Sequence, residues 1–146
     1  MNNNFKLTIH TPDTLKSLPL PLFSNNVRAG FPSPAEDHIE QTLDLNHHLI
    51  KHPAATFFVR VEGDSMKRGG IHHGDLLIVD RALSPKNGQI VVAILNGEFT
   101  VKRIYKEKNT LYLKPENPDF PPIKVTEEMD FQVWGVVTFA IHTCTH

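Results

Sequence analysis

Residues 89–105, QIVVAILNGEFTVKRIY, decide the fold class of this chain. Two apolar runs rich in β-branched and aromatic residues, 89–95 and 98–105, flank the dipeptide Asn96-Gly97. This dipeptide is the strongest short signal for a two-residue β-hairpin, because both turn positions need a positive φ. The stretch therefore predicts a β-hairpin.

Further strand-like stretches lie on both sides of this hairpin. Runs of β-branched, aromatic and other apolar residues occur at 56–62, 76–79 and 110–114, and a long one closes the chain at 131–141. Several short strands with turn residues between them indicate a compact, mostly antiparallel β domain. We therefore expect a mostly β fold, with small helices on its N-terminal side.

The N-terminal part of the chain has a different composition. Residues 1 to about 34 are polar and rich in proline, a composition that forbids a continuous helix and favours an extended arm. The motif Ser33-Pro34-Ala35-Glu36 then predicts a helix start, with Ser33 as N-cap and Glu36 completing a capping box. The segment before this start is thus interpreted as an arm that either docks on another surface or stays mobile.

Short helices are expected after this start. Apolar residues follow at roughly helical spacing, at positions Ile39, Leu43, Leu49 and Ile50. We accordingly divide the chain into an N-terminal arm with the start of a helix, residues 1–39, and a core-bearing β domain, residues 40–146.

Size, charge and cysteine content exclude several functional classes. The chain has 146 residues and a formal net charge of −1, so no overall attraction to nucleic acid is expected. Cys144 is the only cysteine, which excludes an internal disulfide and favours a reducing, cytoplasmic setting. No apolar run approaches the roughly 20 residues that span a bilayer, and the N-terminus lacks the apolar region of a signal peptide, so no membrane association is expected.

Ser65 and Lys102 are the candidate catalytic residues. Ser65 follows Gly63 and Asp64 in a turn after a predicted strand, and Lys102 lies inside the strand 98–105. A serine nucleophile needs a base, and a lysine can supply one when burial lowers its pKa. Strand alternation puts Lys102 on the same face as Thr100 and Ile104. If that face is covered, the pattern predicts a Ser-Lys hydrolytic dyad.

The nine histidines do not form a recognisable metal motif. His48 and His52 have helical spacing, and His72-His73 falls in a predicted loop, but a structural zinc site normally needs four ligands at recognisable spacing. We therefore expect no metal and no cofactor, with solvated or interfacial histidines. Trp134 and Phe131 are interpreted as core or dimer-contact residues.

Several motifs carry a resemblance to a known family. They are Phe31-Pro32-Ser33-Pro34-Ala35, Asp44-Leu45-Asn46, Gly63-Asp64-Ser65-Met66, Gly69-Gly70-Ile71, Gly74-Asp75-Leu76-Leu77-Ile78-Val79-Asp80, Gly97-Glu98-Phe99-Thr100-Val101-Lys102 and Gly135-Val136-Val137. In order and spacing they resemble the LexA-like family of self-cleaving serine peptidases, and within it the UmuD-like SOS mutagenesis proteins. The resemblance implies a LexA/UmuD-like antiparallel β domain over 40–146 that also dimerises.

The resemblance also implies roles for individual residues. Ser65 would be the nucleophile and Lys102 the general base. The scissile bond would be Ala29-Gly30, with Val27 and Phe31 as flanking apolar anchors. Small residues suit a bent segment that must place its carbonyl on the serine.

Partners follow from the same resemblance. Self-cleavage would be promoted by a RecA–single-stranded DNA filament, and the shortened homodimeric product would be an accessory subunit of an error-prone, UmuC-like Y-family translesion DNA polymerase in the SOS response to DNA damage. Only 29 residues precede Gly30, and they do not read as a helix-turn-helix domain. No direct sequence-specific DNA binding is therefore expected.

Three alternatives remain open from the sequence. The chain could be a non-catalytic dimeric interaction scaffold, or a truncated regulator similar to LexA or phage repressors. A signal-peptidase-like Ser-Lys enzyme shares the serine-methionine motif but would need a membrane anchor.

Overall fold

The computed structural model describes residues 6–13, 16–23, 29–30 and 39–145. The chain divides into two compact units, one formed by Met1–Pro12 with His52–His146 and the other by Asp13–Lys51. The predicted division into 1–39 and 40–146 is a different, functional partition, and it stays a prediction.

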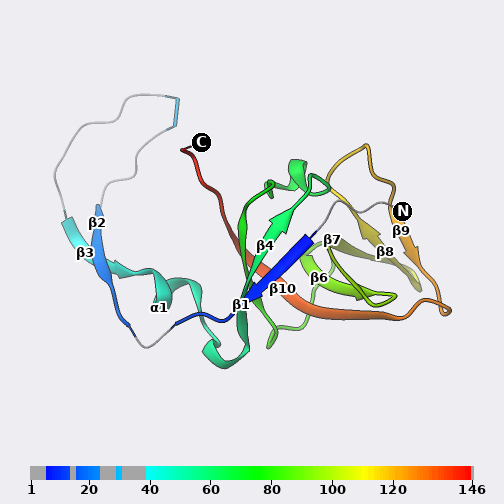
Figure 1. Cartoon of the computed structure of the whole chain (residues 1–146), viewed down its shortest axis with the longest axis horizontal. Coiled ribbons are helices and arrows are strands. Elements are labelled where there is room, and N and C mark those ends of the chain that lie inside the picture. The colour runs from blue at the N-terminus through cyan, green and yellow to red at the C-terminus, as the bar shows by residue number, and fades with distance from the viewer. Residues whose placement is uncertain (1–5, 14–15, 24–28, 31–38, 146) are drawn as a thin grey trace. The chain divides into compact units, whose positions relative to one another are not determined.

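An eight-stranded antiparallel sheet forms the first unit (Figure 1). In spatial order its strands are β1 (Lys6–His10), β4 (Thr56–Glu62), β5 (Leu76–Asp80), β10 (Phe131–Ile141), β6 (Ile90–Leu95), β7 (Glu98–Glu107), β8 (Thr110–Lys114) and β9 (Ile123–Val125). The predicted mostly β, antiparallel fold is confirmed. β1 and β9 were not predicted as strands.

The β6–β7 hairpin forms as the sequence predicts. Asn96 and Gly97 have φ values of +50° and +81°, and Leu95 pairs with Glu98 across the two-residue turn. Asn96 also donates its backbone N–H to the Asp130 carbonyl at 2.7 Å. The turn dipeptide thus fixes the register between β6 and β7.

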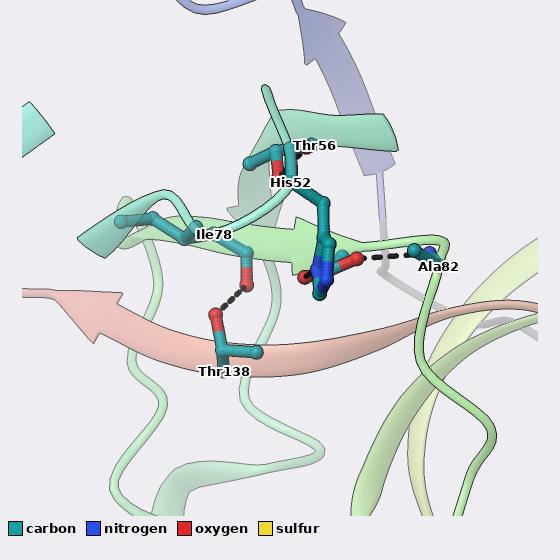
Figure 2. Close-up of polar contacts among 6 residues, drawn as sticks. His52, Thr56, Ile78, Ala82 and Thr138 are labelled. Atoms are coloured by element: carbon teal, nitrogen blue, oxygen red, sulfur yellow. Dashed lines mark hydrogen bonds and ion pairs between the residues drawn. The ribbon is translucent and has the colours of Figure 1, made fainter. Parts of the chain in front are cut away.

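Strand β10 lies between β5 and β6 and shifts register twice, between Val133 and Gly135 and between Val137 and Phe139. At the second shift, the Thr138 hydroxyl donates to the Ile78 carbonyl at 3.2 Å (Figure 2). Such irregularities bend a strand and increase its local twist. With these bends, the long strand β10 can pair with both β5 and β6 in a curved sheet.

Two apolar clusters cover the sheet on opposite sides of β6. Val92 belongs to a cluster that also contains Val59 and Val101, whereas Val91 and Ala93 belong to the other. All five side chains are fully buried. Because successive strand residues point to opposite faces, β6 is buried on both faces. Trp134 packs against the first cluster, so its interpretation as a core residue holds.

A buried carboxylate anchors the start of the sheet's second strand. Asp80 is 4% exposed, and its Oδ2 lies 2.6 Å from Nδ1 of His52. Its Oδ1 accepts the Ala82 backbone N–H at 2.8 Å, and the Thr56 hydroxyl donates to the His52 carbonyl at 2.7 Å (Figure 2). These bonds fix the chain where it enters β4.

The second unit contains a hairpin of β2 (Pro19–Phe23) and β3 (Ile39–Asp44), followed by α1 (Leu45–Leu49). The helix predicted from Ile39 is therefore wrong for residues 39–44, which pair with β2. In so short a segment the helical and strand periods are hard to separate, and backbone pairing decides between them.

The short helix α1 that does form begins after Asp44, whose Oδ1 accepts the Asn46 backbone N–H at 3.1 Å. The helix start predicted at Ser33-Pro34-Ala35-Glu36 lies outside the described residues. Of the predicted helices, then, the described residues contain this single turn of α-helix and short 3₁₀ turns.

Candidate active site

Ser65 lies in the tight turn that follows β4. Gly63 has a φ of +109°, a conformation that glycine adopts without strain, and a one-turn 3₁₀ helix, Lys67–Gly69, follows. The Lys67 backbone N–H donates to the Asp64 carbonyl at 3.1 Å. Ser65 is only 3% exposed, so the turn directs it into the protein.

Two neighbouring loops hold this turn in place. The Gly63 N–H donates to Nδ1 of His73 at 3.1 Å, and the Asn117 side-chain amide donates to the Asp64 carbonyl at 2.9 Å. The Arg68 N–H donates to the Glu116 carbonyl at 2.8 Å. The backbone on both sides of Ser65 is therefore tied to other parts of the sheet unit.

Lys102 enters the same buried region from β7, where it pairs with Val91 of β6. Its side chain is 2% exposed. The ammonium nitrogen Nζ lies 3.4 Å from Ser65 Oγ, 2.9 Å from Thr100 Oγ1 and 3.2 Å from the Val101 carbonyl oxygen. The predicted shared face of Lys102, Thr100 and Ile104 is buried throughout.

Burial changes the protonation of this lysine. Removal from water lowers the pKa of Lys102 from 10.5 to about 8. The charged amine is disfavoured because little solvent is left to stabilise it. At pH 7 about a tenth of the amine is therefore neutral beside the Ser65 hydroxyl, far more than for a solvated lysine.

Thr100 and Asn117 are site residues that sequence reasoning did not single out for a role. Thr100 was placed on the Lys102 face, and two-residue spacing in a strand was the signal that could have identified it as a contact. Asn117 lies in the loop after β8 and contacts the Ser65 turn across 53 positions of sequence. Nothing in the sequence pattern indicates that contact.

An open pocket of about 380 Å³ adjoins the turn. Its lining includes Arg68, Asn117 and the predicted rigid segment Phe120-Pro121-Pro122. Asn117 and the Arg68 backbone also hold the Ser65 turn, so the pocket shares residues with the support of that turn, whereas Ser65 itself is not among its lining residues.

Ala29 and Gly30, the predicted scissile pair, form an exposed bend in the second unit. Gly30 has a φ of +93°, which a residue with a side chain rarely adopts. Val27 and Phe31, the predicted flanking anchors, lie outside the described residues. The structure thus brings Ser65 and Lys102 together within the sheet unit, and the predicted cleavage pair belongs to the other unit.

Several histidines pair with carboxylates or with each other. Nδ1 of His142 lies 2.7 Å from Oδ1 of Asp75, which is 1% exposed, and the rings of His142 and His72 are in tilted contact with centroids 4.8 Å apart. The interpretation as solvated or interfacial histidines did not include these contacts of His52 and His142 with two buried carboxylates, Asp80 and Asp75. Within the described ranges, no group of three or more histidine, cysteine, aspartate or glutamate side chains is arranged to hold a metal ion.

The model of the family described as Peptidase S24-like matches residues 21–138. The chain belongs to this family. The matched range contains Ser65, Lys102 and the Ala29-Gly30 pair, and it covers most of the chain. The predicted LexA-like family membership is confirmed.

Three relatives show which members of the S24 family this chain is similar to. Protein SamA of Salmonella typhimurium is 52% identical over 122 residues, covering 84% of each chain. Protein MucA of Escherichia coli is 43% identical over 123 residues, again 84% of each. The LexA repressor of Shewanella denitrificans is 49% identical over 113 residues, which cover 77% of this chain and 54% of the repressor. The chain is a UmuD-like SOS mutagenesis protein of the S24 family.

In the part of the chain that the structure describes, no helix is long and apolar enough to span a membrane.

Proposed function

We propose that this chain cleaves its own backbone between Ala29 and Gly30 with a dyad of Ser65 and Lys102. The observation that carries the proposal is the Lys102 amine, buried, with its pKa lowered to about 8, and 3.4 Å from Ser65 Oγ. This separation is long for a hydrogen bond. Catalytic hydrogen bonds often tighten only when substrate binds.

The contacts of Lys102 suit a general base. A neutral amine has two N–H donors and one lone pair. Thr100 Oγ1 and the Val101 carbonyl are in range to accept the two N–H bonds. The lone pair of the neutral amine can accept the Ser65 proton, so that the hydroxyl oxygen can attack the Ala29 carbonyl carbon.

The reaction proceeds in two steps. Attack gives a tetrahedral intermediate, whose collapse breaks the Ala29–Gly30 bond and leaves Ala29 as an ester on Ser65. The protonated Lys102 gives its proton to the departing Gly30 amine. Lys102 then takes a proton from water, which hydrolyses the ester and frees Ser65.

The cellular role is proposed from the family. A RecA–single-stranded DNA filament promotes the cleavage by raising the population of the productively docked cleavage segment, without adding a catalytic group. The shortened product acts in the cytoplasm as a homodimeric accessory subunit of a UmuC-like Y-family translesion polymerase. Processing is then the activating step.

The test is intact mass spectrometry of the purified full chain after incubation at pH 10, where Lys102 is neutral. We expect a new fragment that begins at Gly30. Ser65→Ala and Lys102→Ala variants, checked for folding by circular dichroism, are expected to stay uncut. Cleavage of the Ser65→Ala variant at the rate of the unchanged chain would refute the dyad. If no fragment forms at pH 10 or with RecA filament, the chain is an interaction scaffold.

A further inference from the structure

Strand β1 belongs to the sheet unit although it lies at the start of the chain. It pairs antiparallel with β4 over five residues, from Lys6 opposite Glu62 to His10 opposite Phe58. The arm thus docks by adding a strand to the edge of the eight-stranded sheet (Figure 1). The sheet curls enough that β1 also comes close to β7, which carries Lys102.

The proposed scissile bond separates these paired strands along the chain. β1 precedes Ala29-Gly30, whereas β4 follows it. The other unit repeats this arrangement, because β2 precedes the bond and its partner β3 follows it. Breaking one peptide bond between paired strands removes neither strand from its ladder.

Backbone pairing with β4 holds β1 on the sheet. Thr8 and His10 are exposed, and Ile9 remains 39% exposed. On the sheet side, Val59 and Val61 are fully buried within the first core cluster. Without β1, the outer edge of β4 would present unpaired N–H and C=O groups, which readily accept another extended strand.

We propose that the β4 edge is a binding site for the chain's own segment 6–10, and that self-cleavage leaves the N-terminal fragment bound without a covalent link. This inference rests on the proposed cleavage at Ala29-Gly30. Release of the fragment is a second step, and this step uncovers the β4 edge. Cleavage and exposure of the β4 edge are therefore separable in time.

The covalent chain between β1 and β4 sets an upper limit on the dissociation constant of this contact. A flexible linker holds its two ends at an effective concentration of about a millimolar or less. For β1 to be docked in the uncut chain, its dissociation constant must lie below that value. After cleavage the same contact depends on total protein concentration. Pairing of β2 with β3 adds a second attachment, although Pro19 and Pro21 in β2 lack N–H donors and make that ladder weaker.

The test cuts the full chain without using its own chemistry. In a Ser65→Ala background, a site for an added site-specific protease replaces residues 24–28, and the folded protein is cut with that protease. Native mass spectrometry and size-exclusion chromatography follow the fragment from about 1 mM to about 1 µM. Hydrogen exchange reports protection of the β4 amides.

We expect the fragment to remain bound at the high concentration and to leave on dilution, with β4 amides losing protection as it leaves. Successive N–H groups of a strand point in opposite directions, so Thr8→Pro combined with Ile9→Pro removes at least one bond to β4. This variant should raise the dissociation constant at least tenfold. A matched control with Asn2→Pro and Asn3→Pro, which precede the strand, should leave it unchanged.

Elution of the fragment apart from the protein at every concentration would overturn the proposal. So would retention that the β1 prolines do not weaken, because the fragment would then be held elsewhere. Exchange of a strand between two copies, seen as a dimer in place of a bound fragment, would also overturn it. Since the added protease makes the cut, none of these results depends on whether Ser65 is a nucleophile.

Discussion

The Lys102 amine lies in a buried region, where the positive charge of its protonated form is unfavourable. Its pKa falls from 10.5 to about 8 because burial removes water from the charged form, a change that corresponds to about 3 kcal/mol. Between these two pH values the unfolded chain binds more protons than the folded chain, so stability rises with pH across that window. Below pH 8 the folded protein holds the protonated amine, and the whole of this free-energy difference lowers its stability.

Removing this amine should therefore stabilise the protein at neutral pH. In a Ser65→Ala background, Lys102→Met is expected to raise the free energy of unfolding at pH 7 by up to about 3 kcal/mol, and the gain should vanish near pH 10.5. Denaturant titrations at both pH values measure this. The matched control Lys106→Met, at an exposed position of the same strand, should show no such pH dependence. An equal gain at both pH values would contradict a charge effect.

Thr100 orients the Lys102 amine through the 2.9 Å contact. Thr100→Val keeps the shape but removes the oxygen, and a lost hydrogen bond to a charged or reacting group costs about 1.5–3 kcal/mol. We expect self-cleavage at pH 10 to slow about tenfold to a hundredfold. Thr138→Val, which removes the hydroxyl bonded to the Ile78 carbonyl, serves as control and should cleave normally. Equal cleavage rates in the two variants would show that Thr100 does not orient the Lys102 amine.

The two dyad residues could be predicted from sequence for different reasons. Lys102 is in a strongly patterned strand, so alternation predicts its face, and the motif context of Ser65 predicts a turn. The expectation that this turn exposes the hydroxyl is wrong, because Ser65 is only 3% exposed. Asn117 could not be predicted, because its contact with the Asp64 carbonyl depends on how a distant loop folds back. Long-range contacts from irregular segments leave no periodic signal.

Among the strands, β10 depends on a glycine at its first irregularity. A Cβ at Gly135 would lie 2.6 Å from Cγ1 of Val79, a fully buried side chain in the sheet core. Gly135→Ala should therefore destabilise the protein by about 1–3 kcal/mol through overpacking. Thermal or urea unfolding measures the loss.

Gly69→Ala is the matched control for that substitution. The nearest atom there is Cγ of the Glu116 side chain, at 2.7 Å, which can move aside more easily than a packed valine. Its loss of stability should be clearly smaller. Equal losses in the two variants would show that close packing against Val79 does not limit position 135.

The strands with long β-branched runs could be predicted almost to the residue, whereas the N-terminal elements could not. β4 and β8 have the predicted bounds. β2 was not predicted because it contains prolines, which are rare in strands. β3 contains a mixture of apolar and polar residues that fits a helix as well as a strand. In these short segments pairing with a partner strand, rather than local preference, decides the conformation.

For the complete chain, the two units should differ in local stability. Among the side chains of Asp13–Lys51 that the structure describes, Ile50 alone is buried, whereas the sheet unit contains two apolar clusters. Segments with few buried apolar contacts open more readily. In a Ser65→Ala background, limited proteolysis should first cut within residues 13–51. Equally early cuts in β5, β6 or β7 would contradict this difference.

The central claim is that a buried Lys102 activates Ser65, and the pH dependence of self-cleavage tests it most directly. The first-order rate of the full chain is measured by intact mass from pH 6 to pH 11, with Ser65→Ala as the blank. The lowered pKa of Lys102, about 8, predicts a rate that rises about tenfold per pH unit below pH 8 and levels off above pH 9. A midpoint near the 10.5 of an ordinary lysine, or a rate independent of pH, would contradict the account.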